Sequence, residues 1–180
     1  MARFGCNDIG FFGNLSGGSA ITGTPYGSFY DTTIQSATLI NTAYAMKLNS
    51  SDSPSTSGVI ITNNAQGNPT QILVKQKGIY NLQFSAQFQR ASGGTTETID
   101  IWLRKNDNTG DLANTNTHVS VQANATYLVT AWSFFVSLNV NDFVELIWST
   151  TSTAIQLYYD SATALHPATP SLIVTINKVS

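Results

Sequence analysis

Short stretches in which apolar and polar residues alternate at every second position recur along most of the chain. The longest covers residues 78–90, GIYNLQFSAQFQR, where the even positions from Tyr80 to Phe88 are aromatic or aliphatic and the odd ones are Asn, Gln or Ser. Only a β-strand places two such sets on opposite faces, because a helix would scatter both sets around its surface. The segment is therefore predicted to be a strand with one apolar and one polar face.

The same period of two predicts four more clear strands, at residues 98–105, 131–138, 142–149 and 171–179. Weaker alternation predicts strands at residues 28–34, 44–48, 59–62, 70–75, 117–122 and 154–159. Residues 35–47 also contain good helix formers, but Tyr44, Met46 and Leu48 alternate, which favours a strand ending there. Turn-forming residues separate the stretches and no long helix lies between them, so about ten strands predict an all-β antiparallel sandwich or barrel.

Residues 1–25 lack this alternation and are interpreted as an extended N-terminal arm, followed by one domain at residues 26–180. The arm is glycine-rich but contains several phenylalanines, which are too few to form a core and which a disordered tail would normally lack. We interpret it as a segment that buries its apolar side chains against another protein; these are Phe4, Ile9, Phe11 and Phe12. The alternative is a frayed terminus.

The composition excludes several classes of protein. Only 18 of the 180 residues are charged, the net charge is −2, and no basic block is longer than two residues, which argues against binding nucleic acid through phosphate contacts. No apolar stretch approaches the roughly 18 residues that span a membrane, and the first residues do not resemble a secretory signal. The single cysteine, Cys6, excludes an intrachain disulfide and a cysteine metal cluster.

Side chains suited to catalysis or metal binding are scarce. The two histidines, His118 and His166, have no nucleophile motif near them, and the ten acidic residues are scattered singly. Asp107 and Asp111 lie close together, but His118 stands where a calcium loop needs its bidentate glutamate. The chain is therefore expected to be no enzyme, with no catalytic residues, no metal site and no cofactor.

Apolar residues interrupt the polar faces of three predicted strands. Ile79 shares a face with Asn and Gln residues, Phe135 lies between two serines, and Ile173 precedes Thr175. A face that combines neutral polar residues with isolated large apolar ones is typical of a subunit interface, where charge is depleted. The predicted interface residues are Ile79, Asn81, Gln83, Ser85, Phe135 and Ile173. The alternative is that these are single exposed hydrophobic residues without a role.

Several segments resemble known proteins. GIYNLQFSAQF resembles a strand signature of the tumour necrosis factor and complement globular-head superfamily, and NDFVELIW and TPSLIVTINKV resemble its later strands. The chain is more similar still to tailed-bacteriophage virion proteins with this domain, through YGSFYDTT, IDIWLRKN, AWSFFVSLN and HPATPS. The resemblance covers about residues 26–180. It implies a ten-stranded jelly roll that forms a homotrimer, with the polar faces of residues 78–90 and 131–138 near the three-fold axis.

The resemblance also implies a non-enzymatic role in the virion. Because only a short arm precedes the domain, without a shaft or repeats, we expect a capsid decoration or cement protein on the head surface, with the major capsid protein as partner. In that role Phe4, Ile9, Phe11 and Phe12 of the arm are expected to anchor the protein to the capsid. The alternative is a receptor-binding module of a head fibre or tail tip that recognises a host-surface glycan. In that case the aromatic residues expected to face the ligand are Trp102, Tyr158 and Tyr159.

Overall fold

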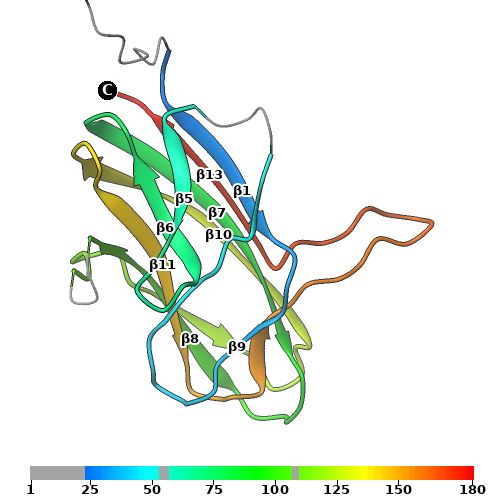
Figure 1. Cartoon of the computed structure of the whole chain (residues 1–180). Coiled ribbons are helices and arrows are strands. Elements are labelled where there is room, and N and C mark those ends of the chain that lie inside the picture. Colours follow the sequence, from blue (N-terminus) through cyan, green and yellow to red (C-terminus); the bar gives the residue numbers. More distant parts are fainter. Residues whose placement is uncertain (1–22, 53–56, 107–109) are drawn as a thin grey trace, which may run out of the picture.

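The computed structural model describes residues 23–52, 57–106 and 110–180, which form thirteen strands and no helix within these ranges. The strands make two antiparallel sheets packed face to face (Figure 1). Sheet A contains β1 (Tyr26–Asp31), β2 (Gln35–Ser36), β4 (Ser50–Ser51), β7 (Gly78–Arg90), β10 (Tyr127–Leu138), β12 (Ile155–Leu157) and β13 (Leu172–Lys178). Sheet B contains β3 (Tyr44–Ala45), β5 (Val59–Asn63), β6 (Pro69–Val74), β8 (Glu97–Lys105), β9 (Thr117–Val121) and β11 (Phe143–Thr150).

The long strand β7 organises sheet A. One of its edges pairs with β10 along nearly its whole length, and the other pairs first with β13 and then, near Arg90, with β12. The strand β13 pairs in turn with β1, and β1 with β4. In sheet B the order is β5, β6, β11, β8 and β9, with β3 beside the far half of β11. Non-consecutive neighbours within both sheets are typical of a jelly roll.

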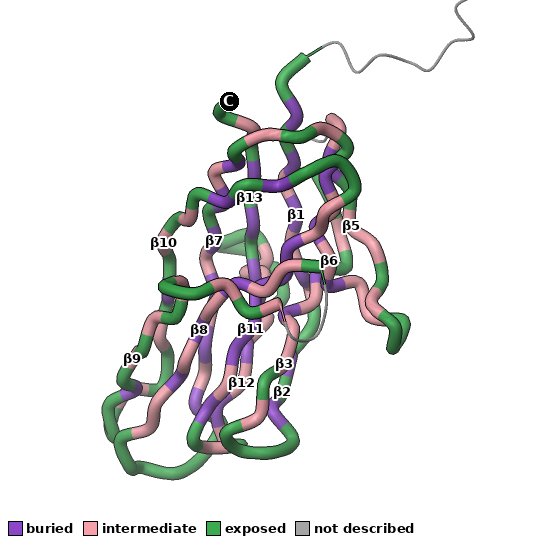
Figure 2. Tube along the Cα trace, turned by 90° about the vertical axis from the view of Figure 1, so that its left-hand side faces the viewer, coloured by how far each residue is buried: buried purple, intermediate pink, exposed green. Residues whose placement is uncertain are grey.

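Alternation along the strands produces the core between the sheets. In β7 the residues Tyr80, Leu82, Ala86 and Phe88 are all at most 1 % exposed, whereas the residues between them are half-buried or exposed. Sheet B contributes the aliphatic side chains of β8 and the indole of Trp148, which packs against Phe88 with ring centroids 5.5 Å apart. Figure 2 shows the resulting alternation of buried and less buried positions along the trace. A filled interior of this kind is the main source of stability in such a domain.

The all-β antiparallel fold predicted from the sequence is confirmed. Ten strands have three or more residues, and β2, β3 and β4 have two each. The strand at residues 78–90 has the predicted bounds, but β10 begins at Tyr127 rather than at residue 131, and β12 contains only three of the six residues predicted for it. The outward side chains at the start of β10, Tyr127 and Val129, are themselves apolar, and this obscures the alternation there.

The segment 35–47 is neither a helix nor one strand. Gln35 pairs with β12 through β2, the chain then turns at Asn41 with a φ of 51°, and β3 follows beside β11. The buried side chain of Gln35 holds this excursion, because its amide donates to the carbonyl oxygen of Lys47 (3.1 Å) and accepts from the Lys47 amide (2.7 Å). The Gln35 side chain thus takes the place of the backbone hydrogen bonds that a continuous strand would have made here.

A polar cluster around Asp142 joins the end of β8 to the turn between β10 and β11. The Asp142 carboxylate accepts from Lys105 Nζ (2.8 Å), from the Asn139 amide (2.7 Å) and from Asn106 Nδ2 (2.8 Å). Partial burial alone would raise the pKa of Asp142, but these hydrogen bonds and the Lys105 charge outweigh it and hold the pKa at about 2. Because β10 belongs to sheet A and β8 to sheet B, the cluster connects the two layers.

Candidate interaction surfaces

The outward side of sheet A forms a broad surface, called here the neutral face. Cross-strand pairing aligns its residues in rows: Phe135 pairs with Asn81, Asn81 with Asn177, and Asn177 with Tyr26. The next rows begin at Ser133 and at Ala131 and run across the same four strands. The neutral face consists of Tyr127, Val129, Ala131, Ser133, Phe135 and Ser137 from β10, Ile79, Asn81, Gln83, Ser85, Gln87 and Gln89 from β7, Ile173, Thr175 and Asn177 from β13, and Tyr26, Ser28 and Tyr30 from β1.

The six residues predicted to form an interface all lie on this face. Ile79, Asn81, Gln83 and Ser85 follow one another along β7, with Phe135 and Ile173 on the two strands beside it. None of the residues that make up the face is charged, and the carboxylate of Asp52, which accepts from Ser28 Oγ (2.7 Å), lies beside its β1 margin. In sheet B, β8 alone carries Glu97, Asp100, Arg104 and Lys105. A solvent-facing sheet usually carries charges that prevent association, so the difference between the two sheets marks the neutral face as suited to contact with protein.

The edge strand β10 is the most apolar part of the neutral face. Phe135 is 72 % exposed, and Tyr127 and Val129 are 60 % and 58 % exposed. The far edge of this 12-residue strand pairs with no other strand in residues 23–52, 57–106 and 110–180. A long edge strand without charges or proline is a template for association, and proteins that retain one usually cover it.

The predicted capsid-anchoring residues lie outside the described part of the chain. Phe4, Ile9, Phe11 and Phe12 all precede Gly23, where the description begins. Close to the start of the described residues, the carbonyl oxygen of Pro25 accepts from the Lys178 amide (2.8 Å). The role of the arm therefore stays a prediction.

Trp102 lines a depression of about 460 Å³ on the outward side of sheet B. Its indole Nε1 donates to Asp111 Oδ1 (2.8 Å), and Arg104 Nε donates to the same oxygen (2.7 Å). The hydrogen bond from Arg104 lowers the pKa of Asp111; burial opposes this effect and the Trp102 bond adds to it. Trp102 is half-buried, because the segment that begins at Asp111 folds back beside β8.

Tyr158 and Tyr159, the other predicted ligand-facing aromatics, follow β12 at the margin of sheet A and are also half-buried. The Tyr158 ring lies 5.6 Å from that of Tyr127 and lines a small hollow with Gln87. Burial, the nearby Asp160 charge and Tyr127 raise the pKa of Tyr158. The structure therefore does not bring the three predicted aromatics together, since Trp102 lies on the other sheet.

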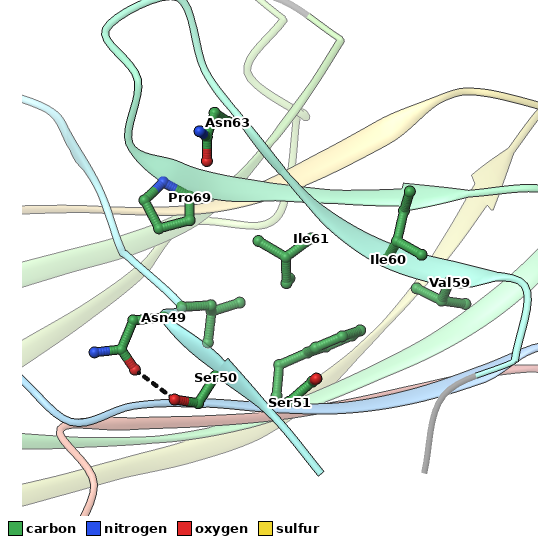
Figure 3. Close-up of a pocket in the computed structure, with 10 residues that line it drawn as sticks. Asn49, Ser50, Ser51, Val59, Ile60, Ile61, Asn63 and Pro69 are labelled. Atoms are coloured by element: carbon green, nitrogen blue, oxygen red, sulfur yellow. Dashed lines mark hydrogen bonds between the residues drawn. The ribbon is translucent and has the colours of Figure 1, made fainter. Parts of the chain in front are cut away.

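A groove that the sequence did not indicate opens between the two sheets at β4 and β5. It has a volume of about 350 Å³, and its apolar wall includes Phe29, Leu48 and Ile61 (Figure 3). The lining also includes polar side chains, and among them Ser50 Oγ donates to Asn49 Oδ1 (2.9 Å). Both flanking strands are the last in their sheets, so the groove is the open side of the sandwich. Alternation at residues 59–62 predicted the strand β5 but not the groove beside it.

The titratable groups of the described residues are dispersed. His118, on β9, contacts Asp100 Oδ1 at 3.0 Å, whereas His166 lies in the segment between β12 and β13 that projects from the domain (Figure 1). In residues 23–52, 57–106 and 110–180, no three His, Cys, Asp or Glu side chains gather closely enough to hold a metal ion. Among the same residues, no helix has the length and apolar character needed to cross a membrane.

Comparison with known proteins supports the fold. No protein-family model matches the chain, and no curated protein sequence matches it. Among solved structures it is similar to murine APRIL, crystallised at pH 8.0, with a TM-score of 0.54 and 10 % sequence identity. The similarity covers 87 % of this chain and 100 % of that one. The chain therefore has a jelly-roll fold of the tumour necrosis factor type.

Proposed function

We propose that the chain is a non-enzymatic structural protein of a tailed bacteriophage, which forms homotrimers through its neutral face and decorates the head. The observation that carries the proposal is the absence of charge from this face, together with the exposed apolar side chains of β10. Burying such a surface gains hydrophobic free energy without the cost of desolvating charged groups.

A ring of three copies fits the position of the apolar residues. Phe135 and Val129 lie on the edge strand of sheet A, whereas Ile173 and Tyr30 lie across the sheet from it. An edge that packs on the face of the next copy makes a contact between two different surfaces. Contacts of this kind close into rings when the rotation permits, and three copies form the smallest ring.

The location on a phage head is supported by the arm and by the resemblance of the domain to virion proteins. The arm places Phe4, Ile9, Phe11 and Phe12 within a short glycine-rich stretch, which suits an extended segment lying across major capsid subunits. In a trimer, three such arms would bind together, so that individually weak contacts give stable attachment through avidity.

Co-sedimentation with phage heads that lack the protein tests the proposal. The full-length chain is compared with a variant lacking residues 2–24, which retains Pro25 and its contact with Lys178. We expect both proteins to be trimers by mass photometry and only the full-length chain to sediment with heads.

The possible failures are distinguishable. Binding by neither protein would contradict the head location while leaving the trimer intact. A truncated protein that unfolds would show that the arm belongs to the domain core rather than to a capsid contact. A full-length chain that remains monomeric would contradict the role of the neutral face.

A further inference from the structure

We propose that the depression beside Trp102 on sheet B is a binding site for a neutral saccharide. The site goes beyond the proposed decoration role and does not depend on it. It lies on the outward side of sheet B, and the neutral face lies on the outward side of sheet A, so the two surfaces are on opposite sides of the sandwich. A trimer formed through sheet A would leave the depression accessible.

Residues from three parts of the chain build this depression. Asp100 and Trp102 project from β8, Ser149 projects from β11 beside Asp100, and Asn114 and Asn116 come from the segment before β9. Its volume of about 460 Å³ lies within the range of small-ligand sites. It therefore has the size for one or two sugar rings.

Each of the two carboxylates of the site is held by hydrogen bonds to only one of its oxygens. Asp100 Oδ1 accepts from Asn116 Nδ2 and lies within hydrogen-bond distance of His118 Nδ1, both at 3.0 Å. Asp111 Oδ1 accepts from Trp102 Nε1 and from Arg104 Nε. In each case the second oxygen, Oδ2, has no hydrogen-bond partner among the described side chains and can accept from a ligand hydroxyl. Carboxylates fixed by their own neighbours lose little freedom when a ligand binds.

The aromatic and amide groups complete a surface suited to a sugar. The Trp102 ring is held through its Nε1 bond to Asp111, and an indole held in this way presents an apolar plate to the C–H face of a pyranose. Asn114, whose side chain has no hydrogen-bond partner within the described residues, can both donate and accept. Sugar hydroxyls likewise donate and accept, and they match this mixture of carboxylates and amides.

The charge of the site favours a neutral ligand over an ion. Two carboxylates oppose an anion, so phosphate or sulfate groups are disfavoured. A cation would meet the guanidinium of Arg104, which is bonded to Asp111 and only 13 % exposed. A neutral polyol uses the carboxylates as acceptors and adds no net charge.

The test follows the indole signals of the protein by NMR. The chain has three tryptophans, and Trp132 and Trp148 face the interior, so they serve as internal controls for folding. The full chain, labelled with ¹⁵N-tryptophan, is titrated with methyl glycosides of glucose, galactose, mannose and N-acetylglucosamine. The Trp102 signal is assigned with Trp102→Phe. We expect at least one glycoside to move this signal saturably while the other two indole signals stay in place.

Two variants separate the site from unspecific effects. Asp100→Asn removes one charged acceptor with little change of shape, and we expect it to weaken the apparent affinity about tenfold, equivalent to one lost hydrogen bond to a charged group. Tyr158→Phe, on the other sheet, should leave the affinity unchanged. Each protein must show the unshifted Trp132 and Trp148 signals, which establishes that it is folded.

Three results would overturn the proposal. The first is the absence of a saturable shift with every glycoside. The second is a shift of the Trp102 signal by tetramethylammonium but by no sugar, which would indicate a cation site. The third is binding that persists in Asp100→Asn but is lost in Tyr158→Phe, which would place the ligand on sheet A. None of these results would bear on trimer formation or on attachment to heads.

Discussion

Replacing Asp142 with asparagine is expected to remove a defined part of the acid sensitivity of the domain. The folded pKa of Asp142 is about 2, against 3.8 for the ordinary group, because Lys105, Asn106 and the Asn139 amide all donate to the carboxylate. A group with a depressed pKa stabilises the fold above its unfolded pKa, and this stability is lost as the pH falls through the folded value. The stability that Asp142 contributes is therefore lost between about pH 4 and pH 2.

The size of the effect follows from the shift. A difference of about 1.8 pKa units corresponds to about 2.4 kcal/mol at most. The Asp142 side chain is 13 % exposed and lies in a surface turn, where water screens part of the interaction. We therefore expect the carboxylate to contribute about 1 to 2 kcal/mol above pH 4 and almost nothing near pH 2.

Urea unfolding between pH 5 and pH 2 measures this contribution. Protein concentration is held constant, because the stability of an oligomer depends on it. The free energy of unfolding of Asp142→Asn should lie about 1 to 2 kcal/mol below that of the wild type at pH 5, and the two values should converge near pH 2. Asp52→Asn, which also removes one surface carboxylate, is the control for net charge.

The comparison isolates Asp142 although other acids titrate in the same range. The pKa of Glu97 is lowered by hydrogen bonds from Thr95 and Thr151, and that of Asp111 by Arg104. Both groups therefore add to the fall of the free energy of unfolding with decreasing pH, in the wild type and in the variants. They cancel when the wild type and Asp142→Asn are compared. A constant difference between the two proteins from pH 5 to pH 2 would refute the reasoning.

The remaining predictions concern the interface and the interior. Phe135→Asp should convert trimers to monomers in mass photometry by placing an unpaired charge at the contact, whereas Leu165→Asp, at a 95 % exposed residue of the projecting segment, should leave trimers intact. Arg90→Met should lower the free energy of unfolding in urea by about 2 to 3 kcal/mol, because three backbone carbonyls lose their guanidinium donor. Gly27→Ala should lower the free energy of unfolding by about 1 to 3 kcal/mol, because the added Cβ would lie 2.5 Å from the buried ring of Phe29. For Arg90→Met and for Gly27→Ala alike, a urea midpoint equal to that of the wild type would contradict the prediction.

The sequence predicted the strands best where the two faces differ most. Tyr80 and its apolar neighbours alternate strictly with Asn, Gln and Ser residues along β7, and the predicted bounds agree with the structure. The start of β10 was missed because Tyr127 and Val129 place apolar side chains on the outward face as well. The same property that hid the strand makes this part of the neutral face suited to protein contact.

Burial could not be predicted from alternation alone. A period of two places Glu145 and Ile147 on the side of β11 opposite Val144, yet both are buried, and the Glu145 carboxylate accepts a hydrogen bond from Thr70. The Trp102 depression was equally hidden, because Asp100, Ser149 and Asn114 come from separate parts of the chain and only the pairing of β8 and β11 brings them together. The residues of the neutral face could be predicted because alternation at every second position separates the outward from the inward side chains within each strand.

The native mass of the full-length chain tests the central claim most directly. One copy has a mass of 19.3 kDa, so the trimer predicted here has a mass of about 58 kDa, three times that value. We expect native mass spectrometry at low micromolar concentration to show this species. A mass of one or two copies that persists to tens of micromolar would contradict the account, because the charge-free face and the edge of β10 would then remain exposed to solvent.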